Sequence, residues 1–105
     1  LLSGIGSLAG ARLRPAGAEG ALELPGDLEI LTLAGSLSRQ GVHLHASVSD
    51  AEGRVFGGHV LPGCLVRTTA ELVLAELRDQ QLARRADPRT GYRELAIRRR
   101  PGGRR

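Results

Sequence analysis

Short apolar runs, separated by glycine and proline, make up most of the hydrophobic pattern of this chain. Some runs alternate apolar and polar positions and others are continuously apolar, and both patterns are typical of strands in an antiparallel sheet. From Arg84 onward the chain is polar and then strongly basic. The pattern predicts a tight bend at 4–6, turns at 25–26 and 62–63, loops at 14–20 and 38–41, and strands at 1–5, 7–13, 21–24, 28–36, 42–49 and 54–61.

Residues 64–77 fit two kinds of structure. Thr68, followed by Glu71 three positions later, resembles the capping box that begins a helix. Apolar and polar positions also alternate through this segment, and its valines and threonines favour a half-buried strand. The pattern favours the strand only slightly.

A β-hairpin is predicted around Asp50-Ala51-Glu52-Gly53. Aspartate at the first position and glycine at the fourth suit a type I turn, and Gly53 in the left-handed conformation completes a three-residue loop. The resulting register pairs Asp50 with Arg54, Ser49 with Val55, Ser47 with Gly57, His45 with His59 and His43 with Leu61.

Paired residues of a hairpin share a face of the sheet, so this register sorts the side chains into two sets. One face is continuously apolar and consists of Val42, Leu44, Ala46, Val48, Phe56 and Val60. The other face carries all three histidines of the chain, His43, His45 and His59. A slip of one residue would bury His59 beside Leu44, so the turn and the hydrophobic pattern select the same register.

These three histidines are candidate ligands for a metal ion. Cross-strand neighbours have Cβ atoms about 5 Å apart and diagonal ones about 7–8 Å apart, so their imidazoles can converge on one ion such as zinc. Gly57 and Gly58 leave space beside His59, and an open fourth position can take water, an anion or a group from a partner. The alternatives are a metal-free ligand pocket and three histidines hydrogen-bonded at a subunit interface. No obvious general base lies in the motif, so no enzyme is expected, and a metal-dependent hydrolase that uses Glu71 is a remote option.

Composition indicates a small core and an uneven charge. The chain has 105 residues, enough for one domain, with one Phe, one Tyr and no Trp. An aliphatic core in a domain of this size is only marginally self-sufficient, so we expect oligomerisation. Residues 84–105 hold nine arginines and two acids, net +7, whereas residues 1–83 hold six arginines and nine acids, net −3. A basic arm for nucleic acid or another polyanion fits this asymmetry, and a solvated, disordered tail fits it equally well.

The single cysteine, Cys64, excludes an internal disulfide, and its apolar surroundings in the sequence favour a buried thiol. A reducing compartment, the bacterial cytoplasm, fits this composition. No apolar run approaches the length that crosses a bilayer, so no membrane partner is expected. The chain opens on Leu1 without an initiator Met, so we expect that an N-terminal portion is missing.

Several segments resemble, in the right order, those of one known domain. His43-Leu44-His45, together with Gly53-Arg54-Val55-Phe56-Gly57-Gly58-His59-Val60, resembles the signature of the plants-and-prokaryotes conserved (PPC) domain of AT-hook proteins. Residues 3–8 resemble its Gly-rich segment, residues 29–36 resemble the segment before the His-x-His strand, and residues 87–95 resemble the end of prokaryotic members.

The resemblance implies a mixed α/β (α+β) fold with a largely antiparallel sheet and few helices, assembled as a homotrimer. It also implies that residues 64–77 form a strand. Family members carry a further strand and helix before the Gly-rich segment, so the domain over residues 1–97 is expected to lack its first strand and helix. Residues 98–105 are then a basic tail.

The tail partly resembles an AT-hook, with Arg100-Pro101-Gly102 present and Arg99 in place of the glycine that precedes the Arg-Pro pair. We therefore interpret it as an electrostatic arm whose phosphate contacts are salt-sensitive. The arginines of this arm are Arg98, Arg99, Arg100, Arg104 and Arg105. The predicted function is that of a trimeric DNA-associated regulatory protein, located at the nucleoid if it binds duplex DNA. The alternative is a protein that binds zinc, another divalent transition metal or a small ligand through its three histidines.

Overall fold

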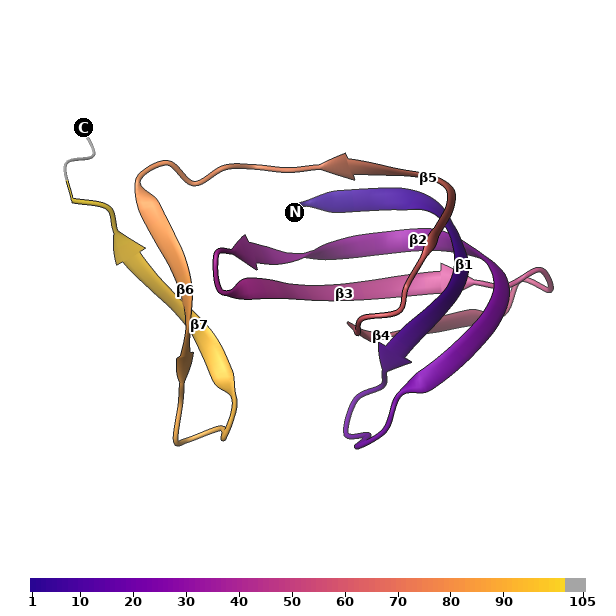
Figure 1. Cartoon of the computed structure of the whole chain (residues 1–105), viewed down its shortest axis with the longest axis horizontal. Coiled ribbons are helices and arrows are strands. Elements are labelled where there is room, and N and C mark those ends of the chain that lie inside the picture. The colour runs from indigo at the N-terminus through magenta and orange to yellow at the C-terminus, as the bar shows by residue number, and fades with distance from the viewer. Residues whose placement is uncertain (102–105) are drawn as a thin grey trace. The chain divides into compact units, whose positions relative to one another are not determined.

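The structure is a computed structural model that describes residues 1–101 (Figure 1). Contacts divide the chain into two units, the first made of residues 1–36 and 43–74 and the second of residues 37–42 and 75 onward. No helix in the described part is long and apolar enough to span a membrane. The strands are β1 (Ser3–Arg14), β2 (Leu22–Ser38), β3 (Gly41–Ser49), β4 (Val55–Val60), β5 (Val66–Val73), β6 (Gln80–Ala86) and β7 (Arg93–Arg99).

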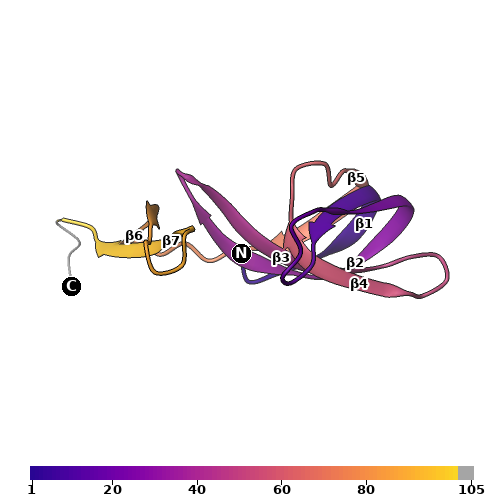
Figure 2. The same ribbon diagram turned by 90° about the horizontal axis from the view of Figure 1, so that it is seen from below.

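Strands β1–β5 form an antiparallel sheet that closes on itself. The strand order is β2-β3-β4-β1-β5, and β1 also pairs with β2, so β1–β4 form a ring. The ring closes at Leu13, which lies opposite both Leu22 of β2 and Val60 of β4. β5 pairs with the first half of β1, outside the ring. In Figure 2, β2 and β3 run as a long twisted ribbon, as expected of paired strands.

The core of the first unit is aliphatic apart from one aromatic ring, as the composition predicts. Phe56, Val60, Leu24, Leu33 and Cys64 pack against it from the periphery, and the thiol of Cys64 is half-buried rather than fully buried. The Cys64 Sγ atom accepts the N–H of Arg12 at 3.3 Å. Among residues 1–101, six hydrophobic residues are buried: Leu8, Ala11, Leu13, Leu28, Ile30 and Val48.

Two predicted interruptions are wrong, because β1 and β2 are longer than their sequence patterns indicate. Residues 4–6 continue β1 without ending it, and Pro25-Gly26 lies within β2 instead of forming a turn. The β1–β2 register shifts between Ala9 and Ala11, where two residues of β2 oppose one of β1. Such a bulge tolerates proline, which has no N–H to donate to the ladder.

The segment that fitted both helix and strand is extended, as the resemblance implied. Thr68 and Glu71 lie in β5, because pairing with β1 overrides their local helix signal. Residues 1–101 therefore contain no helix, and the few helices expected of an α+β fold are not found in this part of the chain. The antiparallel sheet is confirmed. The homotrimer stays a prediction.

The second unit contains a hairpin, β6–β7, that was not predicted. Its strands pair from Gln80 opposite Arg99 to Ala86 opposite Arg93. The turn between β2 and β3 belongs to the same unit, where the Gln40 side chain accepts the N–H of Arg84. Arginine occupies many positions of this hairpin, so the hydrophobic alternation that normally reveals a strand is weak.

Candidate metal-binding site

The hairpin that carries the histidines closes through the predicted turn. The Gly53 N–H donates to the Asp50 carbonyl, and the Asp50 N–H donates to the Arg54 carbonyl, each at 3.0 Å. Gly53 has a φ of 76°, the left-handed conformation that this turn needs. The Asp50 carboxylate also accepts the N–H groups of Glu52 and Arg54, at 3.0 and 2.9 Å. The turn chemistry thus fixes the register of both strands.

The predicted register is confirmed over the length of the β3–β4 ladder. Beyond it, Leu61 does not continue alongside His43, because its N–H donates instead to the Arg12 carbonyl of β1 at 3.0 Å. β4 thereby passes from one neighbour to the other and closes the ring. The predicted pairs found in the ladder are His45–His59, Ser47–Gly57 and Ser49–Val55.

The predicted apolar face of the hairpin is buried at its centre. Val48 is fully buried, and Phe56 and Val60 pack against the core. Val42, which was expected on the same apolar face, is 63% exposed, so the buried part of this face does not extend to the first residues of β3. The histidines lie on the opposite face, as the alternation predicts.

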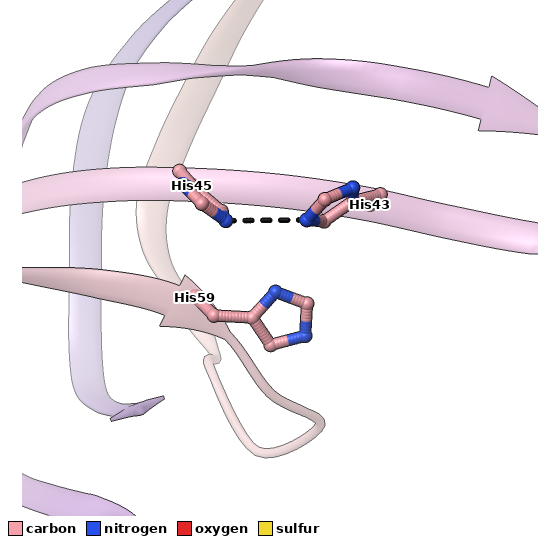
Figure 3. A group of neighbouring side chains, drawn as sticks. All are labelled: His43, His45 and His59. Atoms are coloured by element: carbon pink, nitrogen blue, oxygen red, sulfur yellow. Dashed lines mark hydrogen bonds between the residues drawn. The ribbon is translucent and has the colours of Figure 1, made fainter. Parts of the chain in front are cut away.

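The structure brings the three predicted ligands together (Figure 3). The ring centroid of His43 lies 5.0 Å from that of His45 and 5.2 Å from that of His59, and the remaining pair is 5.6 Å apart. Nε2 of His43 and Nε2 of His45 are 3.2 Å apart, a hydrogen-bond distance. One ring nitrogen of each histidine lies within 4.8 Å of the other two. Within residues 1–101, the cluster contains three imidazoles and no carboxylate or thiol.

His59 is half-buried and lacks a partner for one ring nitrogen. Its Nδ1 is buried and has no hydrogen-bond partner within the described residues. Burial lowers the pKa of His59, and the positive charges of Arg14, His43 and His45 lower it further. The neutral imidazole, which is the form that binds a metal ion, is therefore favoured.

Gly58 serves strand packing, whereas we expected both Gly57 and Gly58 to leave space for a ligand beside His59. A Cβ atom at Gly58 would lie 2.6 Å from the Arg14 carbonyl oxygen, and one at Gly57 would lie 3.3 Å from the Ala46 carbonyl oxygen. Glycine at position 58 thus lets the backbones of β1 and β4 approach closely, next to the pair of Arg14 and His59.

Arg14 is a neighbour of the cluster that no local sequence pattern indicated. It lies opposite His59 in the antiparallel pair of β1 and β4, and cross-strand partners share a face. The two positions are 45 residues apart in the chain, so only knowledge of this strand pairing could have identified it. Glu71, by contrast, faces Ile5 on β1 and is not part of the cluster. The structure therefore offers no support for Glu71 as an acid or base at the histidines.

The arginines of the predicted DNA-binding arm do not form one loose segment. Arg98 and Arg99 lie in β7, opposite Gln81 and Gln80. The Arg100 N–H donates to the carbonyl of Asp79 at 3.0 Å, so this residue is also held at the hairpin. Their exposed side chains remain available to a polyanion. The other two arginines of the arm, Arg104 and Arg105, lie outside the described residues.

Comparison with known sequences gives one family and two named relatives. The sequence profile of the Plants and Prokaryotes Conserved (PCC) domain, the domain abbreviated PPC above, matches residues 1–78. Two proteins named "Bifunctional protein GlmU", from Synechococcus sp. strains JA-3-3Ab and JA-2-3B'a(2-13), are each 53% identical to this chain over 97 residues. That match covers 92% of this chain but only 16% and 15% of the relatives, so the chain spans about a sixth of their length.

The fold is also found in solved structures of other proteins. A hypothetical protein of Salmonella enterica superposes with a TM-score of 0.85 at 43% identity, over 95% of this chain and 76% of the other. A protein from Bacteroides thetaiotaomicron, whose name suggests without asserting that it binds DNA, superposes with a TM-score of 0.71 at 23% identity. This second match covers 91% of this chain and 73% of the other, and it shows the fold alone.

Proposed function

This chain belongs to the Plants and Prokaryotes Conserved (PCC) domain family, and we propose that it binds a divalent transition metal, with zinc as the first candidate. The ligands in this proposal are His43, His45 and His59. The observation that carries it is the convergence of one ring nitrogen from each of them to within 4.8 Å of the others.

The separation between the ring nitrogens of His43 and His45 suits a zinc ion. At a tetrahedral zinc with Zn–N bonds of 2.0–2.1 Å, two ligand nitrogens are about 3.3 Å apart. The Nε2 atoms of His43 and His45 are 3.2 Å apart, which matches this spacing. For His59 we assign Nδ1 as the ligand atom, because it is buried and has no other partner in the described chain. Three protein ligands leave a fourth position open.

A metal-free cluster is the alternative, and it leaves one polar group unsatisfied. A hydrogen bond between His43 and His45 can satisfy one nitrogen of each ring without an ion. The same arrangement leaves Nδ1 of His59 buried and unpaired. An unpaired buried polar group destabilises the fold, and most buried polar groups in proteins therefore have a hydrogen-bond partner. A metal ion would use that nitrogen together with the other two.

The test is the metal content and zinc affinity of the wild type and the His59→Ala variant. We expect about one zinc per chain after zinc is added in slight excess and the protein is desalted, because the site is built within one hairpin. Loss of one of three ligands should weaken zinc binding by at least about 100-fold, which calorimetry or competition with a chelator measures. Ser49→Ala, on the same face of the same strand pair, is the matched control and should bind zinc like the wild type.

Two outcomes would contradict this proposal. One is a wild-type protein that takes up no zinc, cobalt or nickel at micromolar concentration. The other is a His59→Ala variant that folds, as judged by circular dichroism, and binds zinc as tightly as the wild type does. The proposal covers binding alone, since Glu71, the one carboxylate considered as an acid or base, faces Ile5 elsewhere on the sheet.

Association with duplex DNA is a second candidate function, and the surface of β7 favours it. Arg98, Arg99 and Arg100 follow one another at the end of this strand, and each is exposed. The name of the Bacteroides thetaiotaomicron structure suggests the same activity for that protein. Consecutive exposed arginines suit phosphate contacts, which give affinity with little sequence preference.

A homotrimer is the assembly that we propose for either function. Eight large apolar side chains of the first unit are each more than half exposed, and four of them lie on β1 and β5. A small aliphatic domain gains stability when exposed apolar side chains are covered by another subunit. The four residues on β1 and β5 are Ile5, Val66, Leu72 and Val73.

A further inference from the structure

Arg14 stands beside the three histidines at a position fixed by the backbone. It is the residue of β1 that pairs with His59 of β4, so the two side chains project from the same face of the sheet. The backbones of β1 and β4 approach closely here, since a Cβ atom added at Gly58 would lie only 2.6 Å from the Arg14 carbonyl oxygen. The Arg14 side chain therefore starts from a backbone position directly beside His59.

The charge of Arg14 is not balanced by a carboxylate of the described chain. Arg14 takes part in none of the ion pairs among residues 1–101, although it is half-buried. Arg12, two residues earlier on the same face, shows the usual arrangement, with its Nε 2.7 Å from Oε1 of Glu23. Arg14 nevertheless lies beside the cluster, because it is the cross-strand partner of His59.

The histidine cluster itself brings no negative charge to the site. Three neutral imidazoles would leave a divalent ion with both of its charges, and the cluster contains no carboxylate or thiolate to offset them. Together with the guanidinium, the loaded site would hold three positive charges over a small region. An arginine and a metal ion side by side are a strong combination for binding carboxylates and phosphates.

We propose that Arg14 binds a small oxyanion, a carboxylate or a phosphate group, that fills the open fourth position of a metal held by His43, His45 and His59. This inference rests on the metal-binding function proposed above. It narrows the three candidates for the fourth position, which were water, an anion and a partner's group, to one chemical class. Arg14 would act as a specificity-determining residue, because it touches the ligand and not the metal.

The experiment uses the full chain loaded with Co²⁺, whose visible spectrum reports a change in its ligands. Acetate, methylphosphonate and neutral imidazole are titrated into the wild type and the Arg14→Gln variant. We expect acetate or methylphosphonate to shift the spectrum, and Arg14→Gln to weaken that binding by about tenfold, the usual effect of losing a charge-assisted hydrogen bond. Imidazole should bind both proteins equally, and the probe that binds more tightly identifies the oxyanion.

The affinity for Co²⁺ itself gives a second readout. Removing the positive charge of Arg14 also removes its repulsion of the ion, so Arg14→Gln should bind Co²⁺ as tightly as the wild type or more tightly. If Arg14 had a purely structural role, the Arg14→Gln variant would instead bind Co²⁺ more weakly than the wild type. Arg12→Gln is the matched control, because Arg12 lies on the same strand and the same face and the substitution removes the same charge. Unlike Arg14, Arg12 already pairs with Glu23. This control should leave anion binding unchanged.

The outcomes separate this inference from the metal site on which it rests. If the wild type takes up no Co²⁺, the metal-binding function fails and the anion site fails with it. If Co²⁺ binds but no anion alters its spectrum, or anion affinity is the same with and without the Arg14 guanidinium, the metal site stands and the anion site is overturned. Arg14→Met, which keeps the apolar stem of the side chain, replaces the Gln variant should that variant not fold.

Discussion

The imidazole of His59 lies in surroundings that disfavour a proton. It is half-buried, and the groups that face it are Arg14 from β1 and two further imidazoles, those of His43 and His45, from β3. Burial and these positive charges together hold the pKa of His59 below its ordinary value of about 6.5. A proton and a metal ion compete for the same lone pair, so a lowered pKa extends metal binding to lower pH.

In the metal-free protein we expect the NMR titration of His59 to have its midpoint below pH 6.5, and Arg14→Gln to raise that midpoint. The folded state then binds a proton less tightly than the unfolded state does. Above pH 6.5, His59 is neutral in both states and does not lower the free energy of unfolding. As the pH falls below 6.5 and through the lowered pKa, the unfolded state binds the proton more readily, so the free energy of unfolding should decrease. Urea unfolding at pH 7.5 and at pH 5.5 measures the change.

The His59→Gln variant isolates the contribution of this residue in that experiment. The loss of stability on acidification should be smaller in the variant than in the wild type, because the variant has no group at position 59 to protonate. A wild type that loses less stability than the variant between the two pH values would contradict the expected sign.

Single residues of the site divide into those that the sequence could predict and one that it could not. His45 and His59 were predictable because one short turn joins their strands and dictates the pairing. Arg14 was not, because its pairing with His59 joins strands far apart in the chain. Nothing near Arg14 in the sequence distinguishes it from the other fourteen arginines.

The β3–β4 hairpin is the element that holds the site, and its turn depends on one backbone conformation. Gly53 adopts a φ of 76°, and a Cβ atom there would meet nothing within 4 Å. A side chain at this position would therefore clash with no neighbour, and the cost of adding one comes from the left-handed backbone alone.

We expect Gly53→Ala to lower the free energy of unfolding by about 1–2 kcal/mol, the usual penalty for a Cβ atom in the left-handed region. Denaturant unfolding followed by circular dichroism measures it. Gly20→Ala is the control, because Gly20 has no positive φ and its Cβ atom would also meet open space. The control should change stability by less than about 0.5 kcal/mol, and an equal loss in both variants would contradict the argument.

Other elements were predicted less well, and the reasons lie in what each pattern reveals. The Pro25-Gly26 pair resembles a turn, but a bulge against β1 keeps it within a strand. The β6–β7 hairpin was missed because arginines take the place of apolar residues along both strands. The Thr68–Glu71 pair shows the opposite case, a local helix signal that loses to pairing with a distant strand.

The charge of the whole molecule is concentrated near its C-terminal end, where residues 84–105 carry a net charge of +7. Much of this charge lies on the β6–β7 hairpin, so the surface proposed for DNA includes a folded element and not only a tail. Three copies in a homotrimer would raise the apparent affinity for a long polyanion through effective concentration.

For DNA we expect fluorescence anisotropy to show binding that weakens steeply with salt. Replacement of Arg98, Arg99 and Arg100 by Gln should reduce the slope of log affinity against log salt by about one unit for each arginine that contacts a phosphate. Light scattering before the titration should give three times the 11.1 kDa chain mass, which fixes the number of arms per particle.

A second triple variant serves as the charge-matched control for the DNA experiment. It replaces three arginines of the first unit that already pair with acids, namely Arg12, Arg54 and Arg67. This control loses the same formal charge, and its salt slope should stay close to that of the wild type. Equal slopes in the two variants would show that net charge, and not the surface of β7, accounts for the binding.

Closure of the ring has a consequence for the order in which the site is assembled. The histidines come from one hairpin, in which His45 and His59 are 14 positions apart, whereas Arg14 reaches His59 across 45 positions when β1 docks. Contacts between nearby positions form sooner during folding than distant ones. If the proposals above hold, the folding chain would bind the metal ion once the β3–β4 hairpin has formed. It could bind the oxyanion only after β1 has paired with β4 and closed the ring.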